Sequence, residues 1–99
     1  MDEDSTLIYE KVLFEDERKQ NQTKLTVNLF RGVEYIHLRK YYMDFSEEWC
    51  PSNEGVAMPM GISNVSELFK GIAEIMSLAE SKETIEEFFG DIIREIYVK

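Results

Sequence analysis

The chain contains a single cysteine, a single histidine and two prolines, and it has no long hydrophobic run. Its one cysteine, Cys50, excludes an internal disulfide, which is typical of proteins in reducing compartments. No segment approaches the roughly 20 apolar residues of a transmembrane helix. The acidic residues 1–10 do not resemble a secretory signal. We therefore expect a soluble, intracellular protein with no membrane partner.

Catalytic and metal-binding patterns are also missing from the sequence. His37 and Cys50 match no nucleophile motif, and a lone strand histidine is most often a structural or surface residue. A metal site needs several nitrogen, sulfur or oxygen ligands at suitable spacing, and no such group occurs. Gly61-Ile62-Ser63 is too short to be a phosphate-binding glycine loop. We expect a protein that is not an enzyme and uses neither a metal nor a cofactor.

The chain is acidic overall, with a formal net charge of −9, but its charge is unevenly spread. Residues 24–44 carry four basic and two acidic side chains, so their local field opposes that of the rest. The length of 99 residues predicts one domain, residues 1–99. A chain of this size buries a thin core, so dimerisation would help to stabilise it.

The first sixty residues have the composition of an antiparallel meander. Segments 7–14, 24–30, 34–43 and 55–58 are rich in strand-forming residues, and Arg31-Gly32 between the second and third is a turn signal. In the second segment apolar and polar residues alternate, with Leu25, Val27 and Leu29 on one face and Lys24, Thr26, Asn28 and Phe30 on the other. These patterns predict four antiparallel strands.

Two helices are predicted after the strands, which together indicate an α+β fold. Asn64 to Glu67 has the spacing of a helix N-cap box, and Ser81 can cap a second helix over residues 82–97. The second helix carries an apolar stripe of Ile85, Phe88, Phe89, Ile92, Ile93 and Ile96. The predicted core of the whole fold comprises Leu25, Val27, Ile36, Leu38, Phe69, Ile72 and Ile75.

The segment FRGVEYIHLRKYYMD, residues 30–44, combines a turn glycine, three cations and four aromatic rings. Cations beside aromatic rings on a sheet suit a nucleic-acid strand, because the cations contact phosphates and the rings stack on bases. The alternative interpretation is ordinary sheet composition, since tyrosine is a good strand former.

This segment resembles the centre of the positive cofactor four family, the single-stranded-DNA-binding transcriptional coactivators, whose pattern there is approximately F-K-G-x-x-x-I-x-[IL]-R-x-[YF]-[WY]-x-[DN]. The matching residues are Phe30, Gly32, Ile36, Leu38, Arg39, Tyr41, Tyr42 and Asp44, with Arg31 in place of the family's lysine. Residues 55–58 resemble the family's fourth strand. The resemblance covers residues 7–80 and makes residues 81–99 a C-terminal helical extension.

The resemblance implies a homodimer of curved four-stranded antiparallel sheets, each followed by a packing helix, that binds single-stranded DNA or RNA. It implies a non-enzymatic role in transcription, replication or recombination, with transcription or replication proteins as further partners. By position, Phe30 and Tyr42 match stacking aromatics, and Arg31 and Arg39 match cations that contact phosphates. The basic neighbours are Lys24 and Lys40, whereas Trp49 either adds stacking or anchors a loop.

The chain departs from the family pattern where basic residues are expected. These positions are occupied by Val33, Cys50, Asn53 and Glu54, and each lost cation weakens phosphate affinity. The main alternative is therefore an acidic protein-interaction module on the same fold that no longer binds nucleic acid strongly. The basic, serine-rich tail of eukaryotic members is absent, which favours a bacterial or phage relative in the cytoplasm over a eukaryotic nuclear protein.

The apolar stripe of the terminal helix requires a partner surface. Burying one large apolar side chain is worth about 1.5–3 kcal/mol, and a sheet already covered by a first helix has little apolar surface left. We expect the stripe to pack across the partner chain of a homodimer, with exchange of helices between protomers as one arrangement. The alternative is that the helix folds back on its own protomer.

Overall fold

The structure is a computed structural model that describes residues 5–97 of the chain. It divides into two compact units, Met1–Asn64 and Val65–Lys99, which we describe separately. The last two residues of the predicted extension over residues 81–99 lie outside the described part. The first four residues of the acidic N-terminus also lie outside it. Within the described part, neither helix is long and apolar enough to cross a membrane.

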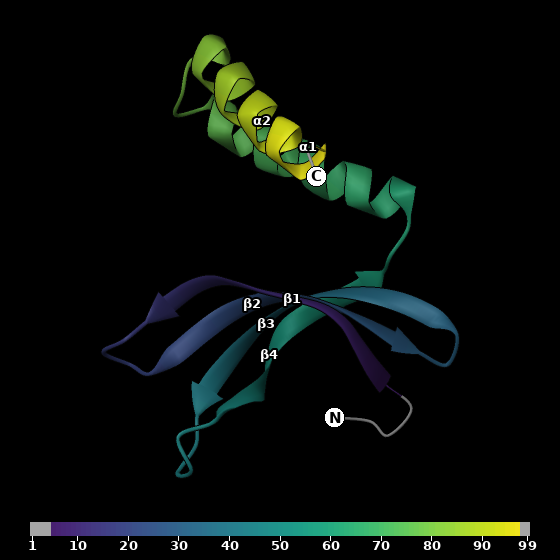
Figure 1. Cartoon of the computed structure of the whole chain (residues 1–99), viewed down its shortest axis with the longest axis vertical. Coiled ribbons are helices and arrows are strands. Elements are labelled where there is room, and N and C mark those ends of the chain that lie inside the picture. Colours follow the sequence, from purple (N-terminus) through teal and green to yellow (C-terminus); the bar gives the residue numbers. More distant parts are fainter. Residues whose placement is uncertain (1–4, 98–99) are drawn as a thin grey trace. The chain divides into compact units, whose positions relative to one another are not determined.

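The first unit is a four-stranded antiparallel sheet with the strand order β1-β2-β3-β4 (Figure 1). The strands are β1 (Ser5–Asp16), β2 (Asn21–Phe30), β3 (Val33–Met43) and β4 (Trp49–Pro59). The predicted meander is confirmed, but β4 begins six residues before its predicted start. Its polar first half joins the sheet because Trp49 and Cys50 pair with Met43 and Tyr42 of β3.

The turn between β2 and β3 is the two-residue hairpin expected at Arg31-Gly32. Both residues have positive φ, 50° at Arg31 and 80° at Gly32. Two successive left-handed residues match the right-handed twist of the flanking strands, and glycine adopts this conformation without steric cost. This tight turn fixes the register of the two central strands, so that Leu25 lies opposite Leu38 and Thr26 opposite His37.

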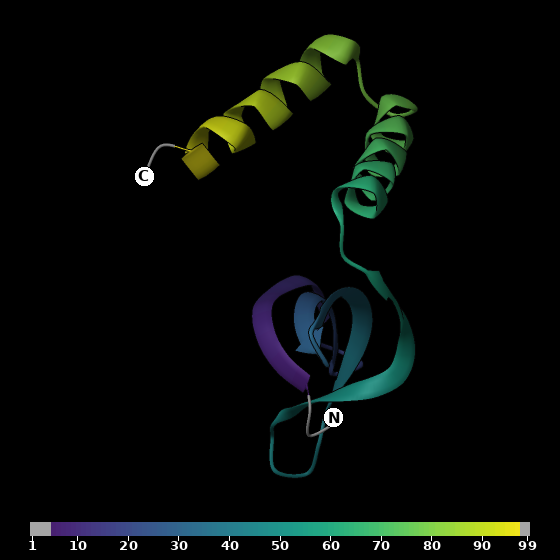
Figure 2. The same cartoon turned by 90° about the vertical axis from the view of Figure 1, so that its right-hand side faces the viewer.

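The two faces of the sheet differ in polarity and in burial. The sheet is strongly rolled (Figure 2), and the most buried side chains of β2 lie on its polar face. They are Gln22, Lys24, Thr26 and Asn28. The apolar face carries Leu25, Val27, Ile36 and Leu38, which were predicted to be core.

Of these four, Val27 is buried, Leu25 and Ile36 are half-buried, and Leu38 is 43% exposed. Within the sheet unit, Leu38 is thus the least buried of these four predicted core residues. Rolling brings side chains of the inner face together and spreads those of the outer face apart, so burial follows curvature rather than hydrophobicity.

The second unit is helical, with α1 (Ile62–Ser77) beginning just before it and α2 (Lys82–Tyr97) ending the described chain. The predicted cap at Asn64 is wrong, because α1 starts two residues earlier and the Asn64 amide instead donates to the carbonyl oxygen of Pro59 at 2.6 Å. The cap at Ser81 is confirmed, since its hydroxyl accepts from the Thr84 backbone N–H at 3.2 Å.

The two helices meet through the rings of Phe69 and Phe89, whose centroids are 6.1 Å apart. Much of the remaining apolar surface is uncovered, since Phe69, Ile72 and Ile75 are all exposed by 48% or more. That these three residues belong to the core of the whole fold stays a prediction. One helix pair is too small to bury the apolar stripes of both of its members.

Replacing Gly55 by alanine should destabilise the sheet. An added Cβ would lie 2.8 Å from the Leu38 carbonyl oxygen and 3.0 Å from the Arg39 Cα, both backbone atoms that cannot move independently. We expect a loss of about 1–3 kcal/mol in the free energy of unfolding, as for other overpacked sites. Urea denaturation measures it, with Gly61→Ala as the control because a Cβ there meets nothing within 4 Å. Equal stability of the two variants would contradict the packing described here.

Candidate nucleic-acid interface

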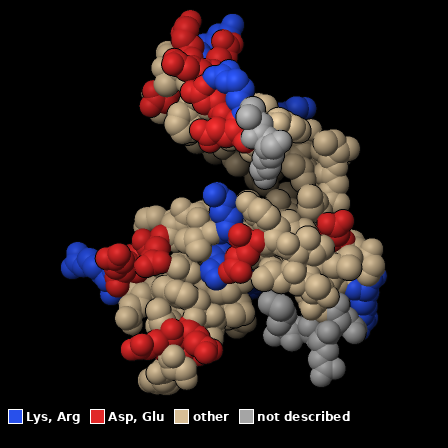
Figure 3. Space-filling view, viewed as in Figure 1, with Lys and Arg blue, Asp and Glu red and all other residues tan. Residues whose placement is uncertain are grey.

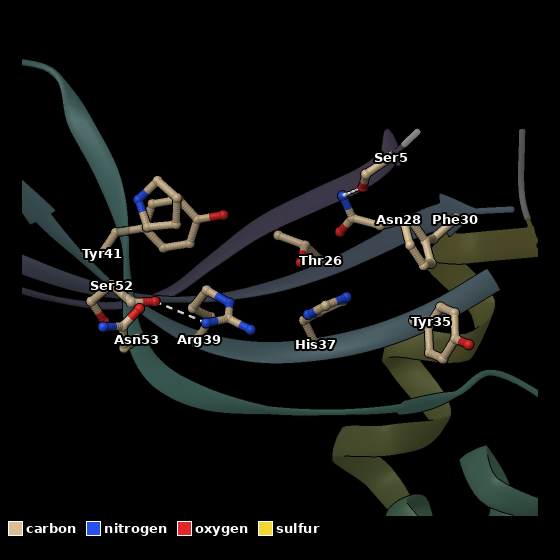
Figure 4. A pocket seen from close by; sticks show the side chains of 11 residues that line it. Ser5, Thr26, Asn28, Phe30, Tyr35, His37, Arg39, Tyr41, Ser52 and Asn53 are labelled. Carbon is tan, nitrogen blue, oxygen red and sulfur yellow. Dashed lines mark hydrogen bonds between the residues drawn. The ribbon is translucent and has the colours of Figure 1, made fainter. Parts of the chain in front are cut away.

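A hollow of about 520 Å³ opens on the polar face of the rolled sheet (Figure 4). All four strands contribute to it. Its lining residues are Ser5, Thr26, Asn28, Phe30, Tyr35, His37, Arg39, Tyr41, Pro51, Ser52 and Asn53. The alternation of β2 and β3 places every second side chain of each strand here, because directly paired residues of antiparallel strands share a face.

Aromatic rings lie at both ends of the hollow, with polar groups between them (Figure 4). Phe30 and Tyr35 form a tilted pair at one end, with ring centroids 6.5 Å apart. Tyr41 lies at the other end and is itself buried. The polar groups between the rings come from Thr26, His37 and other lining residues. Flat apolar faces with hydrogen-bonding groups between them can hold planar heterocycles such as bases.

Arg39 is the charged centre of the hollow. Its Nη1 donates to the carbonyl oxygen of Ser52 at 2.8 Å (Figure 4). An irregularity in β4 makes this possible, since Arg39 pairs with Gly55 but Tyr41 pairs with Pro51, so two extra residues bend β4 toward the guanidinium. A guanidinium has five N–H donors, so this one bond positions the group and leaves capacity for a phosphate.

His37 lies beside Arg39 on the floor of the hollow. Burial and the nearby Arg39 cation, in that order, lower the pKa of His37 below its ordinary value of about 6.5. The imidazole is therefore neutral at neutral pH and can both donate and accept a hydrogen bond. Of the residues lining the hollow, all of them within the described chain, Arg39 alone is a permanent cation.

Lys24 lies on the same face as Arg39, its register partner, but does not line the hollow. It is 8% exposed. Its ammonium group is ion-paired with the Glu10 carboxylate of β1 and lies 4.4 Å from the centroid of the Tyr41 ring. In this state its charge is balanced within the protein.

Cys50 has the properties of a structural thiol. Its Sγ donates to Asp44 Oδ2 at 3.2 Å, and this bond, more than burial, raises the pKa of the thiol. The same carboxylate accepts the backbone N–H groups of Ser46 and Glu48, and the Glu48 bond, more than that of the Cys50 thiol, lowers the pKa of Asp44. A neutral thiol is a poor nucleophile. Within residues 5–97, no cluster of three or more His, Cys, Asp or Glu side chains could hold a metal ion.

Comparisons with known proteins agree with this architecture. A model of the family Transcriptional Coactivator p15 (PC4) matches residues 18–63. Among solved structures, the bacteriophage T5 homologue of the eukaryotic transcription coactivator PC4 is similar, with a TM-score of 0.67 and 30% identity over 97% of this chain and 99% of that one. The chain belongs to the PC4 family. The resemblance to a bacterial or phage-type member is confirmed, and membership supports a DNA-binding role. No curated protein matches.

The structure of this PC4-family protein brings only some of the predicted site residues together. Phe30 and Arg39 line the hollow. Arg31 lies in the hairpin turn, with its guanidinium carbon 5.0 Å from the centroid of the Phe30 ring. Trp49 is half-buried at the start of β4, opposite Met43.

Tyr42 and Lys40 lie elsewhere. Alternation along β3 assigns both to the face opposite Arg39, where Tyr42 is 49% exposed. Lys40 is ion-paired with Glu54 at 3.4 Å between Nζ and Oε2. Glu54, which stands where the family has a lysine, therefore also balances a predicted binding cation.

Sequence reasoning missed Tyr35, His37 and Tyr41 as lining residues. Each is an odd-numbered residue of β3, like Arg39, and therefore lies on the same face as Arg39. The hairpin turn sets the residue of β2 that each of them pairs with. The signal was present in the alternation of β3, but the comparison with the family pattern favoured Tyr42 over its neighbour Tyr41.

Lowering the pH from 7.5 to 5.5 should destabilise the protein through His37. Because the pKa of this group is lowered in the folded state, the unfolded chain binds the proton more readily below about pH 6.5. Stability contributed by the neutral imidazole is therefore present above that pH and is lost as the pH falls. Urea denaturation across this range should show a smaller loss for His37→Gln than for the wild type. Parallel pH profiles for the two proteins would refute this account.

Proposed function

We propose that the protein binds single-stranded DNA in the hollow of its sheet, as a non-enzymatic homodimer of the coactivator type acting in transcription, replication or recombination. The observation that carries the proposal is the position of Arg39 between two aromatic ends of one concave surface. The T5 relative is implicated in recombination-dependent DNA replication, which supports a role in DNA metabolism.

The hollow favours a single strand over a duplex for a steric reason. A ring can stack on a base only when a face of that base is exposed, and in a duplex both faces are covered by neighbouring base pairs. The rings of Phe30, Tyr35 and Tyr41 lie within a space of about 520 Å³, which suits unstacked bases rather than a double helix. A duplex would meet the sheet only through its phosphates.

The charge distribution supports selective rather than tight binding. Arg39 in the hollow and Arg31 in the adjoining turn provide local positive charge. Residues 62–97 carry eight acidic and three basic side chains, and groups of acidic side chains are visible on the helical surface in Figure 3, beside basic and uncharged ones. Negative charge away from the hollow repels loosely bound nucleic acid. We infer modest affinity that depends on a correctly seated strand.

The homodimer is supported by apolar surface that a single chain leaves exposed. On the sheet this surface includes Leu29, Leu38 and Val56, and on α2 it includes Phe88, Ile93 and Ile96. Each group is larger than the scattered apolar residues of a typical monomer surface. A second copy of the chain would supply a matching apolar surface by symmetry.

A protein-interaction module remains the second candidate function. Two of the predicted binding cations, Lys24 and Lys40, are already paired with Glu10 and Glu54. A sheet with fewer available cations and an acidic helical unit fits a basic protein partner better than it fits DNA.

Alanine substitution in the hollow should weaken binding of a labelled oligothymidylate. Phe30→Ala should weaken it by about 1–3 kcal/mol, the usual contribution of a base stacked on an aromatic ring. Tyr42→Ala should have little effect, because Tyr42 lies on the face opposite the hollow. Phe45→Ala is the control, because Phe45 is a fully exposed ring in the β3–β4 turn and is not among the lining residues. An equal loss for Tyr42→Ala would contradict binding confined to the hollow.

The same titrations in increasing salt test the phosphate contact. Arg39→Ala should reduce the slope of log K against log salt by about 0.7, the value for one phosphate contact on a single strand. Arg18→Ala, an exposed cation in the β1–β2 turn, should not change the slope. If the wild type fails to bind single strands even at low salt, the protein-interaction function replaces this one.

Deleting residues 81–99 should weaken the homodimer. Each large apolar side chain of α2 buried against a partner contributes about 1.5–3 kcal/mol. The truncated protein should melt at a lower temperature that depends more strongly on protein concentration, because more of it is monomeric. Sedimentation velocity measures the oligomeric state directly. An equally stable dimer after truncation would show that α2 serves another partner or its own protomer.

A further inference from the structure

Strand β1 contributes carboxylates to the polar face of the sheet. Its register with β2 shifts by one residue between Leu7 and Tyr9, which places Glu10 opposite Thr26. Without this bulge Glu10 would lie opposite Leu25 on the apolar face, because a one-residue slip exchanges the faces of a strand. The bulge therefore brings a negative charge to the face that holds Arg39 and the hollow.

The contact made by Glu10 is with Lys24, a cation beside the hollow on the same face of the sheet. Its Oε1 accepts from the Lys24 Nζ, and the same Nζ lies 4.4 Å from the centroid of the Tyr41 ring, which closes one end of the hollow. The Lys24 side chain is 11% exposed, whereas that of Glu10 is 38% exposed. The ammonium group is thus held in place while its carboxylate partner remains accessible to solvent.

We propose that Glu10 is a phosphate mimic that occupies Lys24 in the free protein and is displaced by a backbone phosphate when a single strand enters the hollow. This proposal rests on the proposed function and adds its regulation. A carboxylate and a phosphate both present anionic oxygens to an ammonium group, so one can replace the other without leaving a buried charge unpaired.

The difference in exposure between Lys24 and Glu10 makes the exchange of carboxylate for phosphate feasible. Water can solvate the carboxylate of Glu10 when it is released, whereas the mostly buried Lys24 ammonium group then needs a replacement anion. The Lys24 side chain is mostly buried, and its ammonium group lies over the Tyr41 ring, 4.4 Å from the ring centroid. A strand that places a phosphate next to Tyr41 therefore forms an ion pair with the buried Lys24 ammonium group, whereas an anion elsewhere on the surface does not. We call the Glu10–Lys24 ion pair the latch. It would lower the affinity for loosely bound anions more than the affinity for a fully seated strand.

The test compares Glu10→Gln with Glu15→Gln. Both variants remove one negative charge from the same face of β1 and keep a side chain that can accept a hydrogen bond. Glu15 accepts from the neutral Gln22 amide at 2.6 Å, so its removal releases no cation. Binding of a fluorescent oligothymidylate is measured by anisotropy at several salt concentrations.

We expect Glu10→Gln to bind the oligothymidylate about tenfold more tightly at low salt, equivalent to about 1.4 kcal/mol. Its salt slope should be steeper than that of the wild type by no more than about 0.7, the value for one extra phosphate contact. Glu15→Gln should bind within about threefold of the wild type with an unchanged slope, because long-range charge alone acts weakly through water. Equal effects of the two variants, or weaker binding by Glu10→Gln, would overturn the proposal.

A second variant separates the latch from stability and from the proposed function. In Lys24→Met the cation is absent. Adding Glu10→Gln to this variant should therefore change the affinity and the salt slope no more than Glu15→Gln changes them in the wild type. If the double variant still gains tenfold, the effect does not act through Lys24 and the latch is wrong. If the wild type and all variants fail to bind at low salt, the proposed function itself fails. Thermal melts without DNA show whether each variant is folded.

Discussion

The strict alternation of side chains along two paired strands is the constraint on which the rest of this structure depends. The tight turn at Arg31-Gly32 sets the register of β2 and β3. Once that register is set, Thr26, His37 and Arg39 must share one face, and Leu25 and Leu38 the other. The roll of the sheet then makes the polar face concave. A polar hollow and an exposed apolar surface are two consequences of the same geometry.

Much of the fold was predictable from local chemistry. Strand-forming runs, the glycine turn and the Ser81 cap each act over a few residues, and each was confirmed. Curvature was expected only from the family resemblance, because it arises from the twist and bulges of the whole sheet rather than from any one segment. Leu38 is 43% exposed within the sheet unit for this reason, since hydrophobicity alone does not tell which face is concave.

The candidate site was predicted in part. Phe30 and Arg39 were identified by resemblance, and the hollow contains both. The pairing of Lys24 with Glu10 could not have been inferred, because it depends on a β1 bulge that has no signature in composition. The same bulge places the Glu10 carboxylate where it balances the charge of Lys24 beside the hollow. The family resemblance thus identified two residues of the hollow, whereas the ion pair beside the hollow was visible only in the structure.

The most direct test of the central claim is nuclear magnetic resonance of side-chain signals during titration with a short oligothymidylate. Binding in the hollow predicts shifts for the Asn28 amide, the His37 ring and the Arg39 Nε–H, which come from the polar face. The amide of Asn64, which is bonded to Pro59, should not move. Saturable shifts confined to the hollow would support the account. Unchanged hollow signals at saturating oligonucleotide would contradict it.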